Sequence, residues 1–263
     1  MLSTSRTSYR IAHNGLVRAQ MSALADGALN VAVLSLLDSR GDHRWRVDGT
    51  PYVVSVGGVP VTIRIRDELG KIDLNAADQD LLLGLFSSTG MSSAQSSAIV
   101  ANILSWRSPN DLQSVGGVND GDYRAASYPY HPRHGPFQSV DELKLVMGMT
   151  PALFQQIEPA LTVYSKRALI KSQTAPSEVA KALSAMIGAA AATSLNETSE
   201  ASFAGDGATL DPFIQLGGRA FTVTTELSAP EFYLRRETVI RLTEDTKKEY
   251  WVLAVRDRRH DSP

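Results

Sequence analysis

The spacing of hydrophobic residues changes twice along this chain of 263 residues, and this change limits the possible folds most strongly. In Pro60–Glu68, apolar and polar residues alternate, which is the period of a half-buried β-strand. From Lys71 onward the spacing becomes helical, and alternation returns near Phe221. Strands on both sides of a helical block predict an α+β body that carries a helical insertion.

The part of the chain before this block predicts one long helix and a hairpin. Apolar residues recur at helical spacing from about Arg10 to Asp38, which is typical of an amphipathic helix. The two glycines Gly57 and Gly58 separate the first two strand-like segments, as in a β-hairpin. At the other end, Glu244–Lys248 is a polar turn between two more alternating segments, so a second hairpin is expected there.

Within the block, helix starts are expected at three places. Asn75 is a predicted N-cap, Ser139–Leu143 has the pattern of a capping box, and Thr150 precedes a proline at the first helical position. One predicted helix face is apolar and carries Ile99, Ile103 and Trp106.

The expected domains follow from these patterns. Residues 1–70 and 215–263 would form the α+β body, and residues 71–166 would form the helical insertion. Residues 167–214 would contain a second helical entry and a flexible loop, because Met186–Leu210 is rich in Ala, Ser, Thr and Gly and predicts a mobile linker.

Composition and motifs do not indicate catalysis. The net charge of −2 gives no broad basic field, and the absence of cysteine excludes disulfides and thiolate metal sites. No nucleophile elbow, phosphate loop or dinucleotide turn is present. Of the five histidines only His131 and His134 are close in sequence, and Pro132 between them opposes a helix that could aim both at one metal. Neither an enzyme nor a zinc site is therefore expected.

The same chain is expected to be soluble as it stands. The best apolar run, Val31–Leu37, is far shorter than the roughly 20 residues that span a bilayer. The first ten residues do not have the pattern of a signal peptide.

Six motifs in the middle of the chain resemble those of the minor pseudopilin K family of bacterial type II secretion systems. They are Lys71–Asn75, Ile103–Arg107, Gly117–Asp120, Pro129–Tyr130, Phe137–Leu143 and Leu161–Val163. A second helical entry of the family is matched more weakly by Lys171–Pro176. The resemblance implies a pilin-like body, meaning a long N-terminal helix on an antiparallel sheet, with a large helical insertion.

The resemblance also implies a function in assembly. Such a protein would cap the tip of the periplasmic pseudopilus with minor pseudopilins I and J, and could contact secreted substrates or the secretin. It would be anchored in the inner membrane by an N-terminal segment that precedes this chain. The part of the helix face expected to dock on partners is Leu16, Ala23, Leu24, Val31 and Leu34.

A calcium site is expected in the loop before and around residue 120, where the family has an acidic calcium-binding loop. The candidate oxygen ligands are Asn110, Asp111, Asn119, Asp120 and Asp122. Ser108, Asn110 and Asn119 stand where the family pattern usually carries acidic residues, which predicts weaker binding. The alternative is a solvated polar turn in which these residues only serve turn geometry.

The rival function is a helix-hairpin-helix nucleic-acid binder. Gly90 and Gly148 each precede a predicted helix, an arrangement whose backbone N–H groups can hold a phosphate. Positive charge nearby is sparse, with only Lys144 close before Gly148, so the electrostatic contribution to binding would be small. Nucleic acid is therefore not an expected partner.

Overall fold

The computed structural model describes residues 2–40, 43–109, 117–193, 216–229, 232–245 and 247–261. The chain forms two compact units, one of residues 1–67 and 209–263 and the other of residues 68–208. The first unit contains a helix and a sheet, and the second is mainly helical. The two are described separately below.

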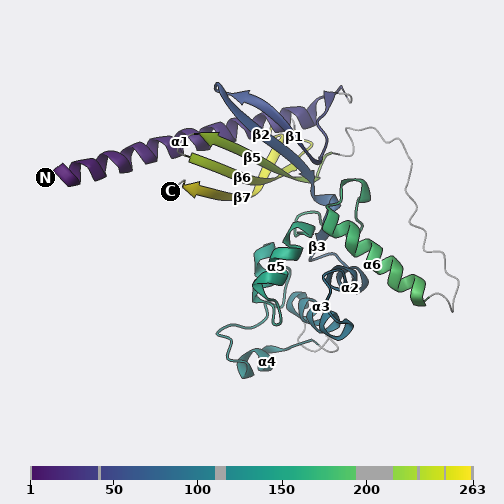
Figure 1. Cartoon of the computed structure of the whole chain (residues 1–263). Helices are drawn as coiled ribbons and strands as arrows, with labels where there is room; N and C mark the ends of the chain where they lie inside the picture. Colours follow the sequence, from purple (N-terminus) through teal and green to yellow (C-terminus); the bar gives the residue numbers. More distant parts are fainter. Residues whose placement is uncertain are drawn as a thin grey trace. The chain divides into compact units, whose positions relative to one another are not determined.

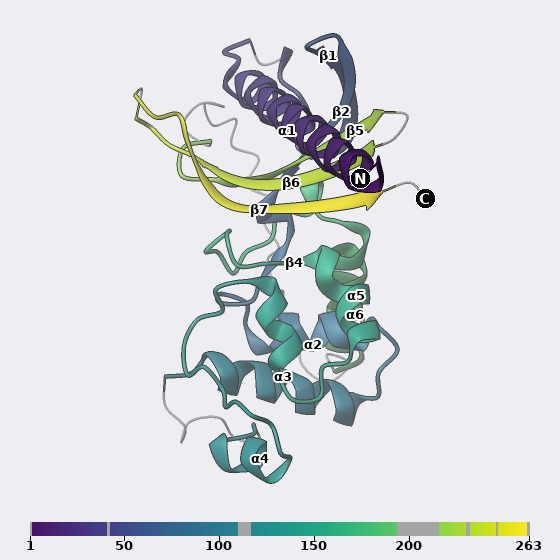
Figure 2. The ribbon, with the colours of Figure 1, turned by 90° about the vertical axis from the view of Figure 1, so that its left-hand side faces the viewer.

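The first unit is a five-stranded antiparallel sheet with one long helix on one face (Figures 1 and 2). The helix is α1 (Leu2–Leu37), and the strand order is β1-β2-β5-β6-β7. The strands are β1 (Asp48–Val56), β2 (Val59–Asp67), β5 (Ala220–Ala229), β6 (Phe232–Leu242) and β7 (Tyr250–Asp261). Strand β2 pairs with β5, with Ile63 opposite Thr225, so the strands before and after the insertion share one sheet. The predicted α+β fold class is confirmed.

The turn between β1 and β2 is made by the two glycines that the sequence indicated. Gly57 and Gly58 have φ angles of 57° and 82°, which L-residues rarely adopt and which a tight hairpin turn of the matching twist requires. A side chain on Gly57 would also meet the side chain of Leu24 on α1 at 3.0 Å. The turn therefore lies close against the helix.

The core of the first unit lies between α1 and the sheet. Helix α1 contributes Met21, Ala25, Ala28, Leu29, Ala32, Val33 and Leu36, which are all buried. They pack against inward-facing strand residues such as Val61, Ile63 and Phe221. Each large side chain buried in this way stabilises the fold by about 1.5–3 kcal/mol. Helix α1 starts at Leu2, eight residues before its predicted start at Arg10, because no proline or glycine interrupts the residues between.

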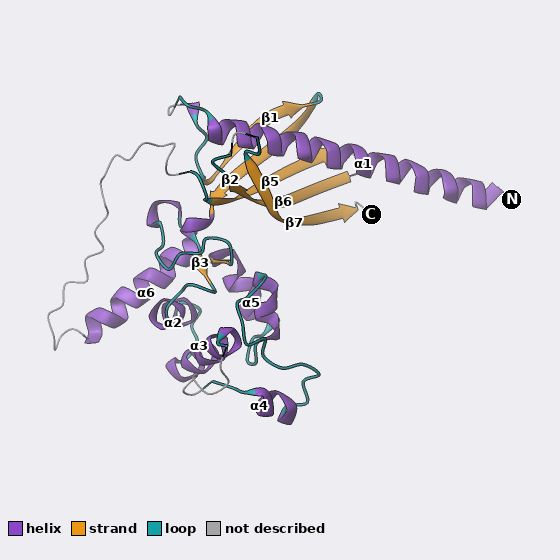
Figure 3. Cartoon of the chain, turned by 180° about the vertical axis from the view of Figure 1, so that it is seen from behind, coloured by secondary structure: helices purple, strands orange, loops and turns teal. Residues whose placement is uncertain are grey.

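In the part of the second unit that the structure describes, five α-helices and four short 3₁₀ helices pack around a hydrophobic core (Figure 3). The α-helices are α2 (Gln79–Ser87), α3 (Ser93–Arg107), α4 (Asp120–Ala125), α5 (Pro151–Ile157) and α6 (Ser177–Thr193). The 3₁₀ helices are η2 (Glu68–Gly70), η3 (Val140–Leu145), η4 (Glu158–Ala160) and η5 (Ser172–Thr174). Two very short strands, β3 (Ile72–Asp73) and β4 (Leu161–Thr162), pair in parallel.

The predicted helix starts are partly confirmed. Thr150 caps α5 by accepting from the N–H of Leu153, as expected. Asn75 is not an N-cap, because Asp78 caps α2 and Asn75 bonds elsewhere in the unit. The predicted capping box at Ser139 is also wrong. Ser139 precedes the 3₁₀ helix η3 and makes no side-chain capping bond.

The predicted mobile linker is wrong over its first residues. Helix α6 continues to Thr193, and it packs against α2. Its run of alanines, the best helix formers, explains why the helix continues where the composition suggested a linker. The rest of the predicted linker, residues 194–210, lies outside the described residues.

Candidate functional site

The buried carboxylate of Asp73 joins distant segments of the second unit. This side chain is 1% exposed, at the end of strand β3. It accepts hydrogen bonds from the backbone N–H of Asn75 at 2.9 Å, the Ser165 hydroxyl at 3.0 Å and the N–H of Lys166 at 2.7 Å. The end of β3 and the segment after β4, about ninety residues apart, are thus joined through one side chain.

Asn75 and Arg107 extend this network to two more motifs. The Asn75 amide donates to the carbonyl of Phe137 at 2.9 Å and accepts from its N–H at 2.7 Å. Arg107 donates to the carbonyls of Leu74 at 2.6 Å and Ala77 at 2.7 Å, and burial lowers the pKa of its guanidinium. These polar residues satisfy backbone groups inside the unit, so their role is to hold the scaffold.

Three of the five predicted calcium ligands can be placed. Asn110 and Asp111 lie outside the described residues. Asn119 caps α4 by accepting from the N–H groups of Gly121 and Asp122, while the Asp122 carboxylate accepts from the N–H of Asn119 at 2.8 Å. Both side chains are therefore engaged in capping a helix. Calcium binding in this loop stays a prediction.

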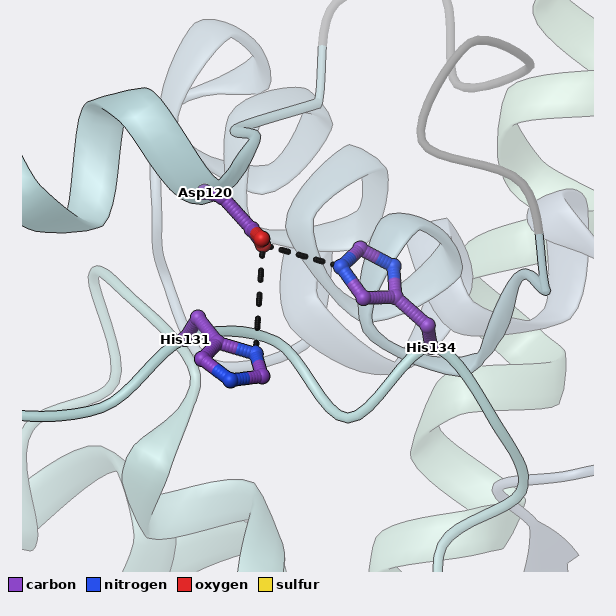
Figure 4. Close-up of side chains that lie close together, drawn as sticks. All are labelled: Asp120, His131 and His134. Atoms are coloured by element: carbon purple, nitrogen blue, oxygen red, sulfur yellow. Dashed lines mark hydrogen bonds and ion pairs between the residues drawn. The ribbon is translucent and has the colours of Figure 1, made fainter.

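Asp120 points instead toward the two histidines of the following loop (Figure 4). Its Oδ1 lies 2.9 Å from Nε2 of His134 and 4.0 Å from Nδ1 of His131. One ligand atom from each residue lies within 4.8 Å of the other two. The hydrogen bond from His134 lowers the pKa of Asp120.

Pro132 lies in a segment without helix or strand, in agreement with the expectation that it opposes a helix. The two histidines nevertheless both lie close to the Asp120 carboxylate, without a helix to align them. His134 has a φ of 53°, in the left-handed region, and this bend turns its ring back toward Asp120. The two rings then stack, with centroids 6.3 Å apart.

Beside this cluster, Tyr123 of α4 forms the buried centre of an aromatic group. Its ring is fully buried against Trp106, Tyr128 and Tyr130. Its hydroxyl accepts a hydrogen bond from the N–H of Met147 at 2.8 Å. Burial raises the pKa of Tyr123 to about 12.

This raised pKa predicts a loss of stability in alkali. The unfolded state ionises Tyr123 near pH 10, but the folded state does so only near 12, so stability is full below pH 10 and falls up to about pH 12. Between pH 10 and 11 the contribution to the free energy of unfolding should fall by about 1 kcal/mol. Urea unfolding at pH 8 to 11 should show this fall in the natural chain and not in Tyr123→Phe.

The control is Tyr233→Phe, in the first unit, which leaves the Tyr123 hydroxyl in place. Tyr123→Phe should also cost about 1–3 kcal/mol at pH 8, because the N–H of Met147 loses its acceptor. Parallel pH profiles for Tyr123→Phe and the natural chain would contradict the assignment.

The helix face predicted to dock on partners is divided in the structure. Leu16 and Leu34 are exposed, at 58% and 66%, and Ala23 is exposed too. Leu24 and Val31 are half-buried and pack against the core of their own unit. The N-terminal end of α1 extends past the ends of the strands (Figures 1 and 3). Among the described side chains of this end, the large exposed apolar ones are Tyr9, Ile11 and Leu16.

By length and composition, α1 is able to cross a membrane over Ser8–Leu37. The sequence did not predict this span because polar residues interrupt the apolar run. Part of the same helix is buried against the sheet of its own unit, as in the core helix of a globular protein.

A second apolar surface was not expected from the sequence. On the edge strand β7, the side chains of Trp251, Val252, Leu253 and Val255 are exposed. The available signal was the apolar run Tyr250–Val255, which interrupts the alternation of this segment and places apolar side chains on both faces of the strand. The hydroxyl of Tyr250 donates to Asn30 of α1 at 3.1 Å, so this strand begins next to the helix.

The architecture defines the class of protein. A long N-terminal helix on an antiparallel sheet, interrupted between β2 and β5 by a helical unit, is a pilin-like fold with a large insertion. One chain of the crystal structure of the GspK-GspI-GspJ complex from the enterotoxigenic Escherichia coli type 2 secretion system has this fold. It matches with a TM-score of 0.62 and 17% identity, over 98% of this chain and 99% of that chain.

The sequence of the middle region resembles a known family. Residues 64–166 match the model of the family described as type II secretion system (T2SS), protein K. The resemblance to the minor pseudopilin K family is confirmed. No curated protein sequence gives a significant match.

Proposed function

We propose that the protein is a minor pseudopilin that joins the type II secretion pseudopilus through α1 and β7 and helps to assemble and cap its tip. The match of residues 64–166 to the protein K family carries this proposal. The partners would be minor pseudopilins I and J, by analogy with the complex that gave the structural match. Secreted substrates and the secretin are further candidate partners.

The exposed apolar residues of α1 support docking on other helices. The side chains of Tyr9, Ile11 and Leu16 are all exposed on this helix. Tyr9 and Leu16 are seven residues apart and therefore lie on one face of the helix, and apolar side chains at such spacing bind well in grooves formed by other helices. Burying each of them in an interface would contribute about 1.5–3 kcal/mol before the cost of association.

The helical unit supports a capping position. It is inserted between β2 and β5 and has its own core, so it adds bulk that a simple pilin subunit does not have. A subunit of this kind would hinder the stacking of further subunits at its end of a filament. The proposed location is the periplasm, with anchoring in the inner membrane through the N-terminal region.

The proposed role needs no catalytic chemistry, and the alternative of nucleic-acid binding has less support. Ser92 caps α3 and Thr150 caps α5, so their hydroxyls accept the N–H groups that a phosphate would need. Lys144, the one basic residue close before Gly148 in the sequence, pairs with Asp141 at 2.6 Å. The net charge of −2 would not provide the electrostatic attraction for phosphate that these two sites lack.

Binding to purified minor pseudopilins I and J from the same organism tests the proposal. The natural chain should form a complex at micromolar concentrations, and Leu16→Glu should weaken it by about tenfold or more, as loss of an apolar anchor does. Leu34→Glu tests the second exposed position of the same helix. Both side chains lie outside the core, so far-UV circular dichroism should be unchanged.

The matched control is Leu169→Glu, which alters an 83% exposed leucine of the other unit. It should bind as the natural chain does. Absence of any complex with the natural chain at micromolar concentrations would overturn the proposed function. Equal binding by all three variants would place the interface away from this helix face.

A further inference from the structure

We propose that Asp120, His131 and His134 form a site for a divalent transition-metal ion such as zinc. The three side chains converge from the start of α4 and from the loop that follows it (Figure 4). The inference rests on this geometry and does not depend on the proposed role in secretion.

The separations of the candidate ligand atoms match a small metal ion. Zinc binds histidine nitrogen and carboxylate oxygen at about 2.0–2.2 Å, so two ligands of a tetrahedral site lie roughly 3.3–3.6 Å apart. The Asp120 oxygen lies 2.9 Å from His134 Nε2 and 4.0 Å from His131 Nδ1. These values bracket the required separation, and all three candidate ligand atoms lie within 4.8 Å of one another, so side-chain adjustments would complete the set.

The donor set selects the class of metal. Two imidazole nitrogens and one carboxylate suit zinc, nickel, copper or cobalt, and a water molecule would complete a tetrahedral site. Calcium instead takes six to eight oxygen ligands. The proposed site therefore differs in chemistry from the predicted calcium loop, although both use Asp120.

The backbone fixes two of the three ligands. Asp120 is the first residue of α4, directly after the capping residue Asn119. His134 is held in the left-handed region, and the N–H of the next residue, Gly135, bonds to the carbonyl of Trp106 on α3 at 3.3 Å. Its ring is three-quarters buried, at 24% exposure. His131 is 68% exposed and has room to move onto an ion.

A bound ion would replace two hydrogen bonds that the histidine nitrogens make in its absence. The ring nitrogen of His134 would release its bond to Asp120, and Nδ1 of His131 would leave the carbonyl of Pro132, now 2.9 Å away. Both nitrogens must be unprotonated to bind metal, so affinity should fall in acid. The ion would also link α4 to the irregular segment of residues 126–139 and stabilise the folded state by mass action.

Calorimetric titration of the metal-stripped, untagged full chain tests the site. Zinc chloride should bind with one ion per chain, and His131→Ala should weaken binding by at least about tenfold through loss of one ligand. Because His131 is largely exposed, this variant should fold as the natural chain does. His134→Asn is the second variant, since asparagine tolerates the left-handed backbone.

The matched control is His13→Ala, on the exposed part of α1, which should leave zinc binding unchanged. Cobalt(II) should give the absorption of a tetrahedral site with the natural chain and lose it with His131→Ala. Zinc binding that is equal in the natural chain and both loop variants would overturn the proposal. Binding of calcium chloride alone, with no zinc binding, would also overturn it and would favour the calcium loop.

Discussion

Asp73→Asn is expected to destabilise the helical unit by about 3 kcal/mol or more, since hydrogen bonds to a charged acceptor contribute about 1.5–3 kcal/mol each. Asparagine keeps the size of the side chain and can still accept from the N–H of Asn75. Its NH₂ group would face two other donors, the Ser165 hydroxyl and the N–H of Lys166. It would also remove the negative charge that favours the buried guanidinium of Arg107.

Urea unfolding followed by Trp106 fluorescence measures this effect. Trp106 is buried in the helical unit, and replacing Trp45 and Trp251 by phenylalanine leaves it as the only tryptophan. The matched control, Asp80→Asn in the exposed first turn of α2, should cost less than about 1 kcal/mol. A change below 1 kcal/mol for Asp73→Asn would mean that the carboxylate does not hold the end of β3 and the segment after β4 together.

Gly84→Val is expected to destabilise the contact between α2 and α6 by about 2–3 kcal/mol, as overpacking of a well-packed site does. A side-chain carbon at Gly84 would lie 2.8 Å from the carbonyl oxygen of Ala182 and 3.2 Å from Cβ of Met186. Both neighbours belong to α6, so the helix would have to move away. If residues 177–193 were an undocked linker, the same change would not destabilise the unit through this contact.

Amide hydrogen exchange of the segment 177–187 measures the docking of α6 directly. Gly84→Val should raise its exchange rate, while the sheet of the other unit keeps its protection. Gly15→Val is the matched control, because a side chain at this helical glycine meets no atom within 4 Å. Unchanged exchange in α6 with Gly84→Val would contradict the observed packing.

Much of the fold could be predicted because it depends on local spacing. The alternation of apolar and polar residues predicted strands where the structure has β2, β5, β6 and β7. The glycine pair predicted the turn at Gly57. The pattern of Thr150 and Pro151 predicted the start of α5. These features are decided by neighbours within a few residues, so the sequence alone contains the information.

The resemblance of the middle motifs to the protein K family could also be seen in the sequence. The structural roles of the residues in those motifs could not. Asn75 has the residue type of a helix cap, yet its amide bonds to Phe137, sixty-two residues away. The Asp73 carboxylate likewise accepts from Ser165 and Lys166, which follow it by about ninety residues. A rule based on neighbouring residues assigns such residues to the nearest helix start, because their hydrogen-bond partners are distant in sequence and come close only in the folded protein.

The sequence by itself determined the α+β class, the helical insertion and the family resemblance, since all three follow from residue types in order along the chain. Only the tertiary structure decided which side chains meet. Asp120 and His134 come together because α4 ends and the following segment bends back at a left-handed residue. The exposed apolar residues of β7 form a surface at the sheet edge, where no further strand of the described residues pairs with β7. Burial and proximity arise from distant parts of the chain packing together, and a linear pattern does not contain that geometry.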